Sequence, residues 1–580
     1  STSGQEDIQK TWWKEAIIYQ IYPRSFQDSD GDGIGDLNGI TSRLDYIQSL
    51  GVDIIWLNPI FLSPNDDNGY DISDYREIMR EFGTMEDFDR LLKEIHKREM
   101  RLVLDLVVNH TSDEHPWFEE ARKSRHNPYY NYYHWWPAEK GEPPLRLSYF
   151  DEEGNAWMYN KSTDSYYLHY FSRKQPDLNW ENPEVRQEIF DMMRFWFDKG
   201  IDGFRMDSIS LIAKDPSFPL IDSKKYPDIF SFYAKEPRLH LYLHEMNRQV
   251  LSKYDCMSVG EGSAVMVDDV AKFVDPAREE LNMLYHFDAA RIRNTTLPDN
   301  PESGIDYSLI ALKKMFTEWD KAVDKGWPSI YLGNHDQPRM VSRFGSDKDE
   351  FRALSAKMLI TFLLTMRGTP YWFAGDEIGM RNIRFDRIEY YNDIDTINRY
   401  KKAKAEGKDP QAVLDEQKET GRDNARTPFQ WDRSPETGFT AGTPWLKVNP
   451  DYTWINVADE EKDPTSILNY FKKVVSFRKE NPSLIYGSYH LLDAENPQSY
   501  TFLRKTGADT YLIMLNFSPK AAISTPGIDM SNAHVLLDNY GDRSHMAPQK
   551  DITLRPFEAI VFQLNHPVYE SFIDSLDLLE

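Results

Sequence analysis

Gly203-Phe204-Arg205-Met206-Asp207 is a short apolar run that carries one charged residue and ends in another. It follows residues 182–200, which predict one amphipathic helix. Asn182 suits the N-cap, Pro183 the first turn and Gly200 the C-terminal end. In a parallel β/α barrel, a strand that follows such a helix delivers its last residues to the catalytic face. The stretch is therefore either a structural Arg–Asp pair or part of an active site.

Seven more apolar runs of this kind alternate with helical patterns along the chain. The eight candidate strands are residues 17–22, 53–57, 102–108, 203–206, 257–260, 284–287, 329–332 and 370–373. Helical patterns between them include residues 40–50, 85–99, 241–251, 307–325 and 352–366. Strand–helix alternation predicts a parallel sheet, and eight units in order predict an α/β fold of the (β/α)8 TIM-barrel type.

Three segments depart from this alternation. Residues 111–182 are rich in Tyr, Trp, Pro and Gly, which predicts a small inserted domain after the third strand. Residues from about 379 to 444 are polar and charged, which predicts a long excursion near the active site. Short alternating strands then predict a C-terminal antiparallel β-sandwich domain. The expected organisation is a barrel at 1–110 and 183–487, an inserted domain at 111–182, and a β-domain at 488–580 with strands at 500–504, 510–516, 534–538 and 559–563.

The composition narrows the class of protein. The chain has 580 residues and a formal net charge of -26, from 94 Asp+Glu against 68 Lys+Arg, so nucleic acid is not expected as a partner. Its single cysteine, Cys256, excludes an intrachain disulfide. The apolar run 358–366 is about half the length that spans a bilayer. We expect a soluble protein of the cytoplasm or periplasm without a membrane span. The oligomeric state is open, with a monomer favoured, and Ser1 fits either a processed secretory N-terminus or a trimmed chain.

Ionisable residues stand at the ends of four candidate strands. The third strand leads into His110, the fourth ends in Arg205 and Asp207, the fifth leads into Glu261, and the seventh leads into residues 334–336. Alone, His110 would be read as a structural histidine and Glu261 as a surface acid. Because buried charges are costly unless they pair or have a function, their joint occurrence at one rim predicts an active site.

Residues 105–110, 203–207, Glu261 and 334–336 resemble the four signature regions of the α-amylase family, glycoside hydrolase family 13. The likeness covers nearly the whole chain. It is greatest with the oligo-1,6-glucosidase and α-glucosidase subfamily, through residues 12–26, 175–180 and 422–432. The resemblance implies a retaining exo-acting α-glucosidase. Such an enzyme removes terminal non-reducing α-1,6- or α-1,4-linked glucose from small oligosaccharides or disaccharides, with sucrose as a further candidate, through a covalent glucosyl-enzyme intermediate.

The resemblance also assigns the catalytic roles. It implies that Asp207 is the nucleophile, Glu261 the general acid/base, and Asp336 a third acid that holds sugar hydroxyls and favours the distorted transition state. A retaining pair lies about 5 Å apart. Glu261 must be protonated at rest, so burial or nearby carboxylates should raise its pKa. Arg205 lies two residues before Asp207 and shares its strand face, so it should keep Asp207 ionised.

Further residues are implied around the reacting glucose. The resemblance places His110 and His335 at its hydroxyls, Asp67, Tyr70 and Arg426 at a closed non-reducing end, and Phe171 and Gln175 along the wall. Pairing of Asp67 with Arg426 is expected to plug the pocket. The Tyr- and Trp-rich inserted segment is expected to roof it further, through residues that include Tyr129, Tyr130, Trp135 and Trp136.

Two positions bear on specificity. Ser208 follows the nucleophile where the subfamily tends to carry valine with α-1,6 linkages and a small or hydroxylated residue such as threonine with α-1,4 linkages. Serine favours broad or mixed linkage use. Residues 291–294 depart from the arginine-rich motif of related sucrose isomerases, which keeps a sucrose isomerase or transglucosidase as the alternative. A non-catalytic relative of the same fold would lack catalytic acids, whereas all three are present here.

Residues 28–36 have the spacing of a calcium loop. Acids stand at positions one, three, five and nine, Gly33 stands at position six, and the position-seven carbonyl is available. Position twelve is Gly39, so the loop is not an EF-hand, and an Asp- and Gly-rich stretch is often only a turn. Since four close acids repel one another and the subfamily often carries calcium here, we expect one structural Ca²⁺, or Mg²⁺ in its place. The expected ligands are Asp28, Asp30, Asp32, Ile34 and Asp36.

Overall fold

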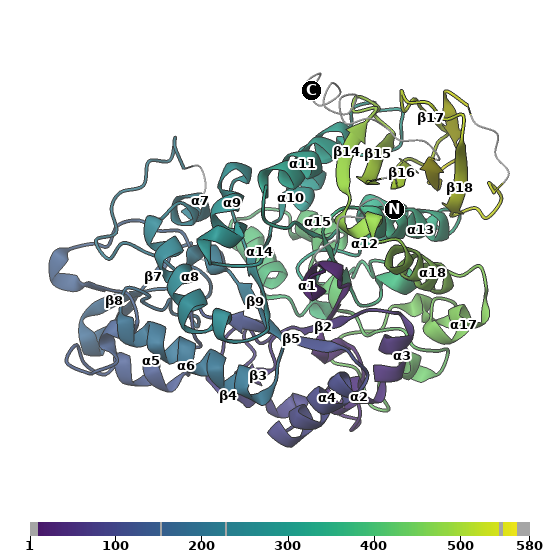
Figure 1. Cartoon of the computed structure of the whole chain (residues 1–580). Helices are drawn as coiled ribbons and strands as arrows, with labels where there is room; N and C mark the ends of the chain where they lie inside the picture. Colours follow the sequence, from purple (N-terminus) through teal and green to yellow (C-terminus); the bar gives the residue numbers. More distant parts are fainter. Residues whose placement is uncertain (1–9, 151–153, 227–228, 508, 545–548, 565–580) are drawn as a thin grey trace.

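The computed structural model describes residues 10–150, 154–226, 229–507, 509–544 and 549–564 (Figure 1). Residues 1–9 and 565–580, which belong to the expected first and last domains, lie outside the described residues. The eight predicted strands form one parallel sheet in the order β11-β10-β9-β5-β2-β1-β13-β12. The TIM barrel is therefore confirmed. Its strands are β1 (Ile18–Ile21), β2 (Ile54–Leu57), β5 (Arg101–Val107), β9 (Gly203–Asp207), β10 (Met257–Glu261), β11 (Met283–Tyr285), β12 (Ser329–Ile330) and β13 (Thr369–Phe373).

Side-chain hydrogen bonds join β11 to β12, the first and last strands of this order, and so close the barrel. At the β11–β12 junction the Ser329 hydroxyl donates to the carbonyl of Leu284 at 2.7 Å, and the Tyr331 hydroxyl donates to the carbonyl of His286 at 2.5 Å. Apolar residues fill the barrel interior, and Trp56 among them supports the guanidinium of Arg205 at 5.1 Å. The interior thus carries a charged group at its catalytic end.

The helix before β9 forms as its sequence predicts. In α6 (Pro183–Lys199) the Asn182 side chain accepts from the Glu184 amide at 3.0 Å, and Gly200 ends the helix with φ 114°. Helices α4, α8, α11 and α13 also fall on predicted patterns. Their bounds are Met85–Lys97, Pro237–Gln249, Leu309–Ala322 and Arg352–Thr365.

One predicted helix is divided. Residues 40–50 contribute to two short helices, α2 (Leu37–Ser42) and α3 (Leu44–Ser49), and Arg43 between them leaves the helical conformation. The Arg43 side chain donates to Gln27 at 2.9 Å and lies 3.9 Å from the ring centre of Trp431. These distant contacts accompany the break, and a local sequence pattern could not predict them.

The inserted segment forms a small antiparallel sheet beside the barrel. Its strands β6 (Trp135–Pro137), β8 (Ser165–Leu168) and β7 (Trp157–Asn160) follow α5 (Pro116–Ala121). The ammonium of Lys214, just beyond β9, is buried between Asp177 at 3.1 Å and Asn109 at 2.8 Å. This contact ties the inserted segment to the ends of two barrel strands.

The later part of the chain adds an excursion and a second sheet. Residues after β13 form α14 (Ile394–Ala405), α15 (Pro410–Thr420) and α16 (Asp423–Arg426), and α18 (Ile467–Glu480) packs on the barrel helix α13. A five-stranded antiparallel sheet follows in the order β14-β15-β16-β20-β18, with β17 and β19 forming a separate pair. These strands are β14 (Ser488–Leu492), β15 (Ser499–Thr506), β16 (Asp509–Asn516), β17 (Ala522–Ser524), β18 (Ala533–Asp538), β19 (Ile552–Leu554) and β20 (Ala559–Leu564).

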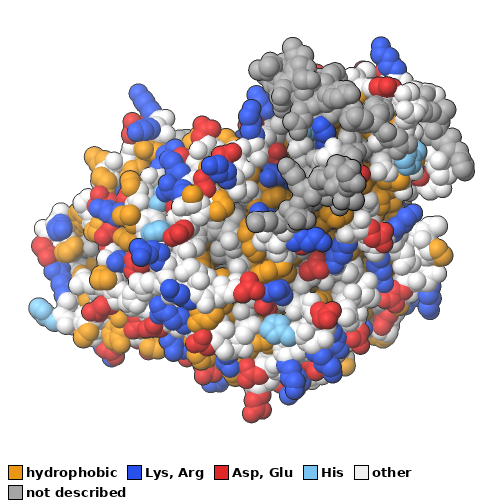
Figure 2. All heavy atoms as spheres, viewed as in Figure 1, with side chains coloured by type: hydrophobic (Ala, Val, Ile, Leu, Met, Phe, Trp, Pro, Cys, Tyr) orange, Lys and Arg blue, Asp and Glu red, His pale blue; other side chains and the backbone are white. Residues whose placement is uncertain are grey.

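The surface carries many charged side chains. Figure 2 shows acidic and basic side chains interspersed over the visible face. Within the described residues, no helix has the length and apolar character needed to cross a bilayer.

Two buried arginines lie at the joint between the barrel and the C-terminal sheet, and one of them, Arg504, spans it. Arg504 on β15 donates to the carbonyls of Thr365 at 2.7 Å and Gly487 at 2.8 Å, and Arg478 on α18 donates to that of Gly368 at 2.8 Å. Both side chains are fully buried. Among the described residues neither arginine forms an ion pair, so main-chain carbonyls near the C-terminal end of α13 and beyond satisfy their charge.

We expect Arg504→Met to lower the free energy of unfolding by at least about 3 kcal/mol, because several buried carbonyls lose their donor. The matched control is Arg433→Gln, which removes an exposed ion pair with Asp459 and should cost less than about 1 kcal/mol. Urea unfolding followed by circular dichroism measures both. Equal midpoints for the two variants would show that the buried arginine does not secure the sheet.

Candidate active site

The predicted site residues gather around one cavity of about 480 Å³ at the carboxyl ends of the barrel strands. Predicted residues that line it are Asp67, Tyr70, His110, Phe171, Asp207, Ser208, Glu261, His335 and Asp336. Three others, Gln175, Arg205 and Arg426, are buried and contact lining residues from behind the wall. The structure therefore brings together residues from segments that lie far apart in the sequence.

One guanidinium organises the catalytic wall. Arg205 Nη1 lies 3.0 Å from Asp105 Oδ1 and 3.1 Å from Asp207 Oδ1, and Nη2 donates to the Glu261 carboxylate. Arg205 and Asp207 leave β9 on the same face, as the period of two residues in a strand requires. The two proposed catalytic carboxyls therefore share a single buried cation.

Burial raises the pKa values of Asp207 and Glu261. Each carboxyl is also surrounded by other acids, and Arg205 only partly opposes the rise. The pair thus holds a proton to higher pH than exposed carboxyls do, and that proton belongs to the pair as a unit. Such a site can provide one acid and one anion at the same time.

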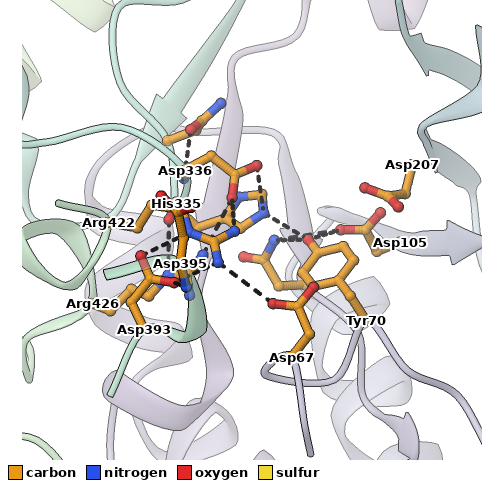
Figure 3. A network of polar contacts seen from close by, with 12 residues as sticks. Asp67, Tyr70, Asp105, Asp207, His335, Asp336, Asp393, Asp395, Arg422 and Arg426 are labelled. Atoms are coloured by element: carbon orange, nitrogen blue, oxygen red, sulfur yellow. Dashed lines mark hydrogen bonds and ion pairs between the residues drawn. The ribbon is translucent and has the colours of Figure 1, made fainter. Parts of the chain in front are cut away.

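The third acid is ionised. Although burial alone would raise the pKa of Asp336, the charges of Arg422 and Arg426 hold it well below its ordinary value. Asp336 Oδ1 lies 3.3 Å from Arg422 Nη1 and 3.2 Å from Arg426 Nη2 (Figure 3). A permanent carboxylate here can accept hydrogen bonds from sugar hydroxyls.

Arg422, and not Arg426, contacts Asp67 at the wall of the cavity. Arg422 Nη2 lies 3.5 Å from Asp67 Oδ1, and the same side chain holds Asp393 at 2.6 Å (Figure 3). Arg426 instead donates to the carbonyl of His335 at 2.9 Å. The expected pairing of Asp67 with Arg426 is therefore wrong, because the guanidinium of Arg422 reaches Asp67. Burial raises the pKa of Asp67 to about 6 although both arginines oppose it.

Arg422 and Asp393 were missed as site residues. Arg422 stands four residues before Arg426 in the stretch that carries the subfamily resemblance, so its charge was a usable signal. Asp393 lies in the polar excursion without a motif around it, and only the fold brings it to Arg422.

A hydrogen-bonded chain fixes His335 and Tyr70. Gln20 Nε2 donates to His335 Nδ1 at 2.8 Å, so His335 Nε2 carries the proton and donates to Tyr70 at 2.8 Å. The Tyr70 hydroxyl then donates to Asp105 at 2.6 Å. The rings of Tyr70 and His335 stack at 5.4 Å. Burial lowers the pKa of His335 well below its usual value, so the imidazole is neutral.

His110 is held in a similar way. Its Nε2 donates to the carbonyl of Tyr70 at 2.9 Å, and Gln175 lies 3.3 Å from the same nitrogen. Burial lowers the pKa of His110. Gln175 also donates to Asp67 Oδ2 at 3.4 Å, which links Asp67 to His110.

The aromatic roof differs from the expected one. Tyr149, Phe150, Phe171 and Phe230 line the cavity. The residues predicted to cover it pack within the inserted segment, where Tyr130 stacks on Trp135 at 4.9 Å and Trp136 meets Trp157 at 6.4 Å. Pairing of β6 with β8 places these rings in the packing of the small sheet. The prediction is therefore wrong for the four named residues, although Tyr149, Phe150 and Phe171 of the same inserted segment do line the cavity.

Ser208 has a strained backbone next to Asp207. Its φ of 45° and ψ of 33° lie in the left-handed region, which costs a non-glycine residue about 1–3 kcal/mol. The residue is buried and lines the cavity. The turn therefore directs the chain away from the sheet immediately after Asp207.

The acidic loop brings three carboxylates together. Oxygens of Asp28, Asp30 and Asp36 lie within 4.8 Å of one another. Burial and the neighbouring acids Asp28 and Asp32 raise the pKa of Asp30 to about 6. Asp32 lies outside this group, and its Oδ1 accepts from the Ile34 amide at 2.9 Å. The donor set of clustered carboxylates fits a hard divalent cation.

The chain is similar to known proteins over nearly its whole length. Residues 20–487 match the family model described as alpha amylase, catalytic domain. The oligo-1,6-glucosidase of Parageobacillus thermoglucosidasius is 51% identical over 571 residues, covering 97% of this chain and 100% of that protein. That of Bacillus cereus is 49% identical over 567 residues, covering 96% and 100%.

A solved structure shows that the chain shares its fold with a related enzyme. A mutant isomaltulose synthase from Erwinia rhapontici NX5, in complex with D-glucose, has a TM-score of 0.91 and 43% identity, covering 96% of this chain and 99% of that one. The chain therefore belongs to the α-amylase family of glycoside hydrolases, and within it to the subfamily of oligo-1,6-glucosidases and α-glucosidases.

Proposed function

We propose that this glycoside hydrolase is a retaining, exo-acting α-glucosidase that removes terminal glucose from short α-linked oligosaccharides. The observation that carries the proposal is that Asp207 and Glu261 share one cation: Arg205 Nη1 lies 3.1 Å from Asp207 Oδ1, and Arg205 Nη2 donates to Glu261. In addition, the contact between Arg422 and Asp67 closes the cavity. Two carboxyls on one cation can differ in protonation, and a closed end admits the end of a sugar chain.

In the first step, an Asp207 oxygen attacks the anomeric carbon and forms an ester while the glycosidic C–O bond breaks. Glu261 gives its proton to the leaving oxygen. In the second step, water gives a proton to Glu261 and attacks the same carbon, which releases glucose and the Asp207 carboxylate. Asp336 stays ionised throughout and accepts hydrogen bonds from the sugar hydroxyls.

The substrate class follows from the closed end and the relatives. Arg422 occupies the space behind Asp67 that a continuing chain would need. The relatives named oligo-1,6-glucosidase support α-1,6 linkages, and Ser208 supports broad or mixed linkage use. The alternative function, that of a sucrose isomerase or transglucosidase, is supported by the likeness to an isomaltulose synthase. Products formed from sucrose separate the two functions, because an isomerase returns a disaccharide and a hydrolase returns glucose and fructose.

We also propose one structural Ca²⁺, or Mg²⁺, at the acidic loop. Asp28, Asp30 and Asp36 would hold it, with Asp32 and the carbonyl of Ile34 as candidates for the remaining positions. Asp28 also accepts from the Thr440 hydroxyl at 2.6 Å, so the loop is tied to the excursion after β13. A cation there would neutralise the clustered acids and stabilise this junction.

Asp207→Asn should lower kcat by at least about a thousandfold with the fold intact, because the covalent nucleophile is lost. The control, Asp268→Asn, changes an exposed acid and should keep the wild-type rate. Initial rates on isomaltose and maltose, with melting temperatures, measure the effect. A variant that keeps more than about a hundredth of the rate would refute the assigned role.

Glucose should be the first product from a linear oligosaccharide, and short substrates should react far faster than starch or dextran. Asp67→Ala should lower kcat/KM by about a hundredfold or more, because a buried hydrogen bond to a charged group is lost. Chromatography of early products checks the mode of cleavage. Internal fragments as first products would contradict the closed cavity, and a wild-type rate for Asp67→Ala would show that Asp67 only shapes the loop.

A chelator should lower the melting temperature and change kcat at 25 °C by less than about twofold. A ligand that binds only the folded state at a hundred times its Kd stabilises it by about 2.7 kcal/mol. Calorimetry with EDTA, and then with added Ca²⁺ or Mg²⁺, measures the shift. In Asp28→Asn the response to both should disappear. An unchanged melting temperature in the wild type would rule out the ion.

A further inference from the structure

Arg343 lies behind the cavity wall, and the reaction described above does not use it. It belongs to α12 (Met340–Phe344) and is 5% exposed. Its Nη1 donates to Gln337 Oε1 at 2.6 Å, and its Nη2 donates to the side-chain oxygen of Asn294. Gln337 and Asn294 both line the cavity. One buried guanidinium thus holds two amides of the wall.

The contact fixes which way both amides face. A guanidinium only donates hydrogen bonds, so the amide oxygens of Gln337 and Asn294 must point toward Arg343. Their NH2 groups then point away from it. Across the described ranges, neither NH2 group has a hydrogen-bond partner within the chain. The wall therefore carries two free donors with a set orientation.

The two amides belong to segments that follow β11 and β12, on the Glu261 side of the barrel. Gln337 directly follows Asp336, and Asn294 lies on α10 (Asp288–Thr295), which follows β11, the neighbour of the Glu261 strand. Asp67 and Arg422, which contact each other, belong to segments that follow β2 and β13. Because Glu261 protonates the glycosidic oxygen, the group attached to that oxygen lies on the Glu261 side.

A purely structural role for Arg343 is a poor explanation of this arrangement. The side chain is buried, and in the part of the chain that the structure describes it forms no ion pair. Burying an unpaired charge is costly. The partners of Arg343 distinguish it from the buried Arg504 and Arg478, which donate to main-chain carbonyls. Arg343 instead holds side chains of the cavity wall. Those side chains are the two amides and no carboxylate.

We propose that Arg343 is a positioning residue that presents the NH2 groups of Asn294 and Gln337 to hydroxyl oxygens of the leaving sugar. The inference rests on the proposed α-glucosidase activity and deepens it. It predicts that the enzyme recognises a sugar, rather than any alcohol, on the leaving side of the bond. The function of Arg343 is therefore in substrate binding and not in bond cleavage.

The test compares a sugar leaving group with one that has no hydroxyls to bind. Isomaltose, or maltose if the wild type prefers it, is the first substrate, and p-nitrophenyl α-D-glucoside is the second. Asn294→Asp and Gln337→Glu keep an oxygen for Arg343 and remove the NH2 donor. Each should raise KM for the disaccharide about fivefold to tenfold, as the loss of a hydrogen bond of about 1 kcal/mol requires. The kcat/KM for the aryl glucoside should change less than about twofold.

Arg343→Met should lower the ratio of disaccharide to aryl-glucoside kcat/KM by about tenfold or more, because both amides lose their orientation. Arg343→Lys should recover part of the ratio, since an ammonium can hold one amide. The matched control is Arg293→Gln. It removes the contacts of Arg293 with the Arg343 carbonyl at 2.8 Å and with Asp306 at 2.9 Å and leaves both amides in place, so the ratio should not change.

The outcomes distinguish the possible errors. If Asn294→Asp and Gln337→Glu leave the ratio unchanged, the proposal is wrong, and these two variants decide the matter even if Arg343→Met does not fold. An equal loss on both substrates, with a lower melting temperature, would also overturn it and leave Arg343 as a packing residue. If the wild type hydrolyses neither substrate, the α-glucosidase proposal itself fails.

Discussion

The buried guanidinium of Arg205 is the interaction on which the site depends. A single cation rests on the aromatic residues of the barrel interior and contacts three carboxyls on three neighbouring strands. Without it, Asp105, Asp207 and Glu261 would be three buried acids in mutual repulsion, and each would take up a proton. With it, the wall can keep one negative charge and one proton side by side. The parallel barrel makes this possible because neighbouring strands end at the same rim.

A second cationic layer lies on the other side of the cavity. Arg422 and Arg426 surround Asp336, and Arg422 extends to Asp67 and Asp393. This layer lowers the pKa of Asp336, whereas burial dominates at Asp207 and Glu261. Acids of the same chemical type therefore have different protonation states within one cavity. The excursion after β13 supplies both arginines, so the electrostatics of the pocket depend on a segment outside the barrel.

The sequence predicted the barrel, its strands and the residues that line the cavity because these depend on local signals. Buried runs between capped helices mark strands, and the period of two residues places Arg205 beside Asp207. The errors all concern contacts between distant segments. Both Arg422 and Arg426 were visible, but the fold of the excursion decides which one reaches Asp67. Similarly, the pairing of β6 with β8 decides that Trp135 and Trp136 pack away from the cavity, and contacts with Gln27 and Trp431 accompany the break in the helix at Arg43.

The buried Arg504 between the barrel and the C-terminal sheet bears on how such a chain can be divided. Arg504 on β15 directs its charge at carbonyls of the barrel and of the joint, among them those of Thr365 and Gly487. A cut near residue 487 would leave one fragment with an unneutralised cation and the other with bare carbonyl oxygens. The sheet is therefore an integral part of the catalytic unit, and neither shuffling of modules nor truncation can exchange it without replacing the joint as well.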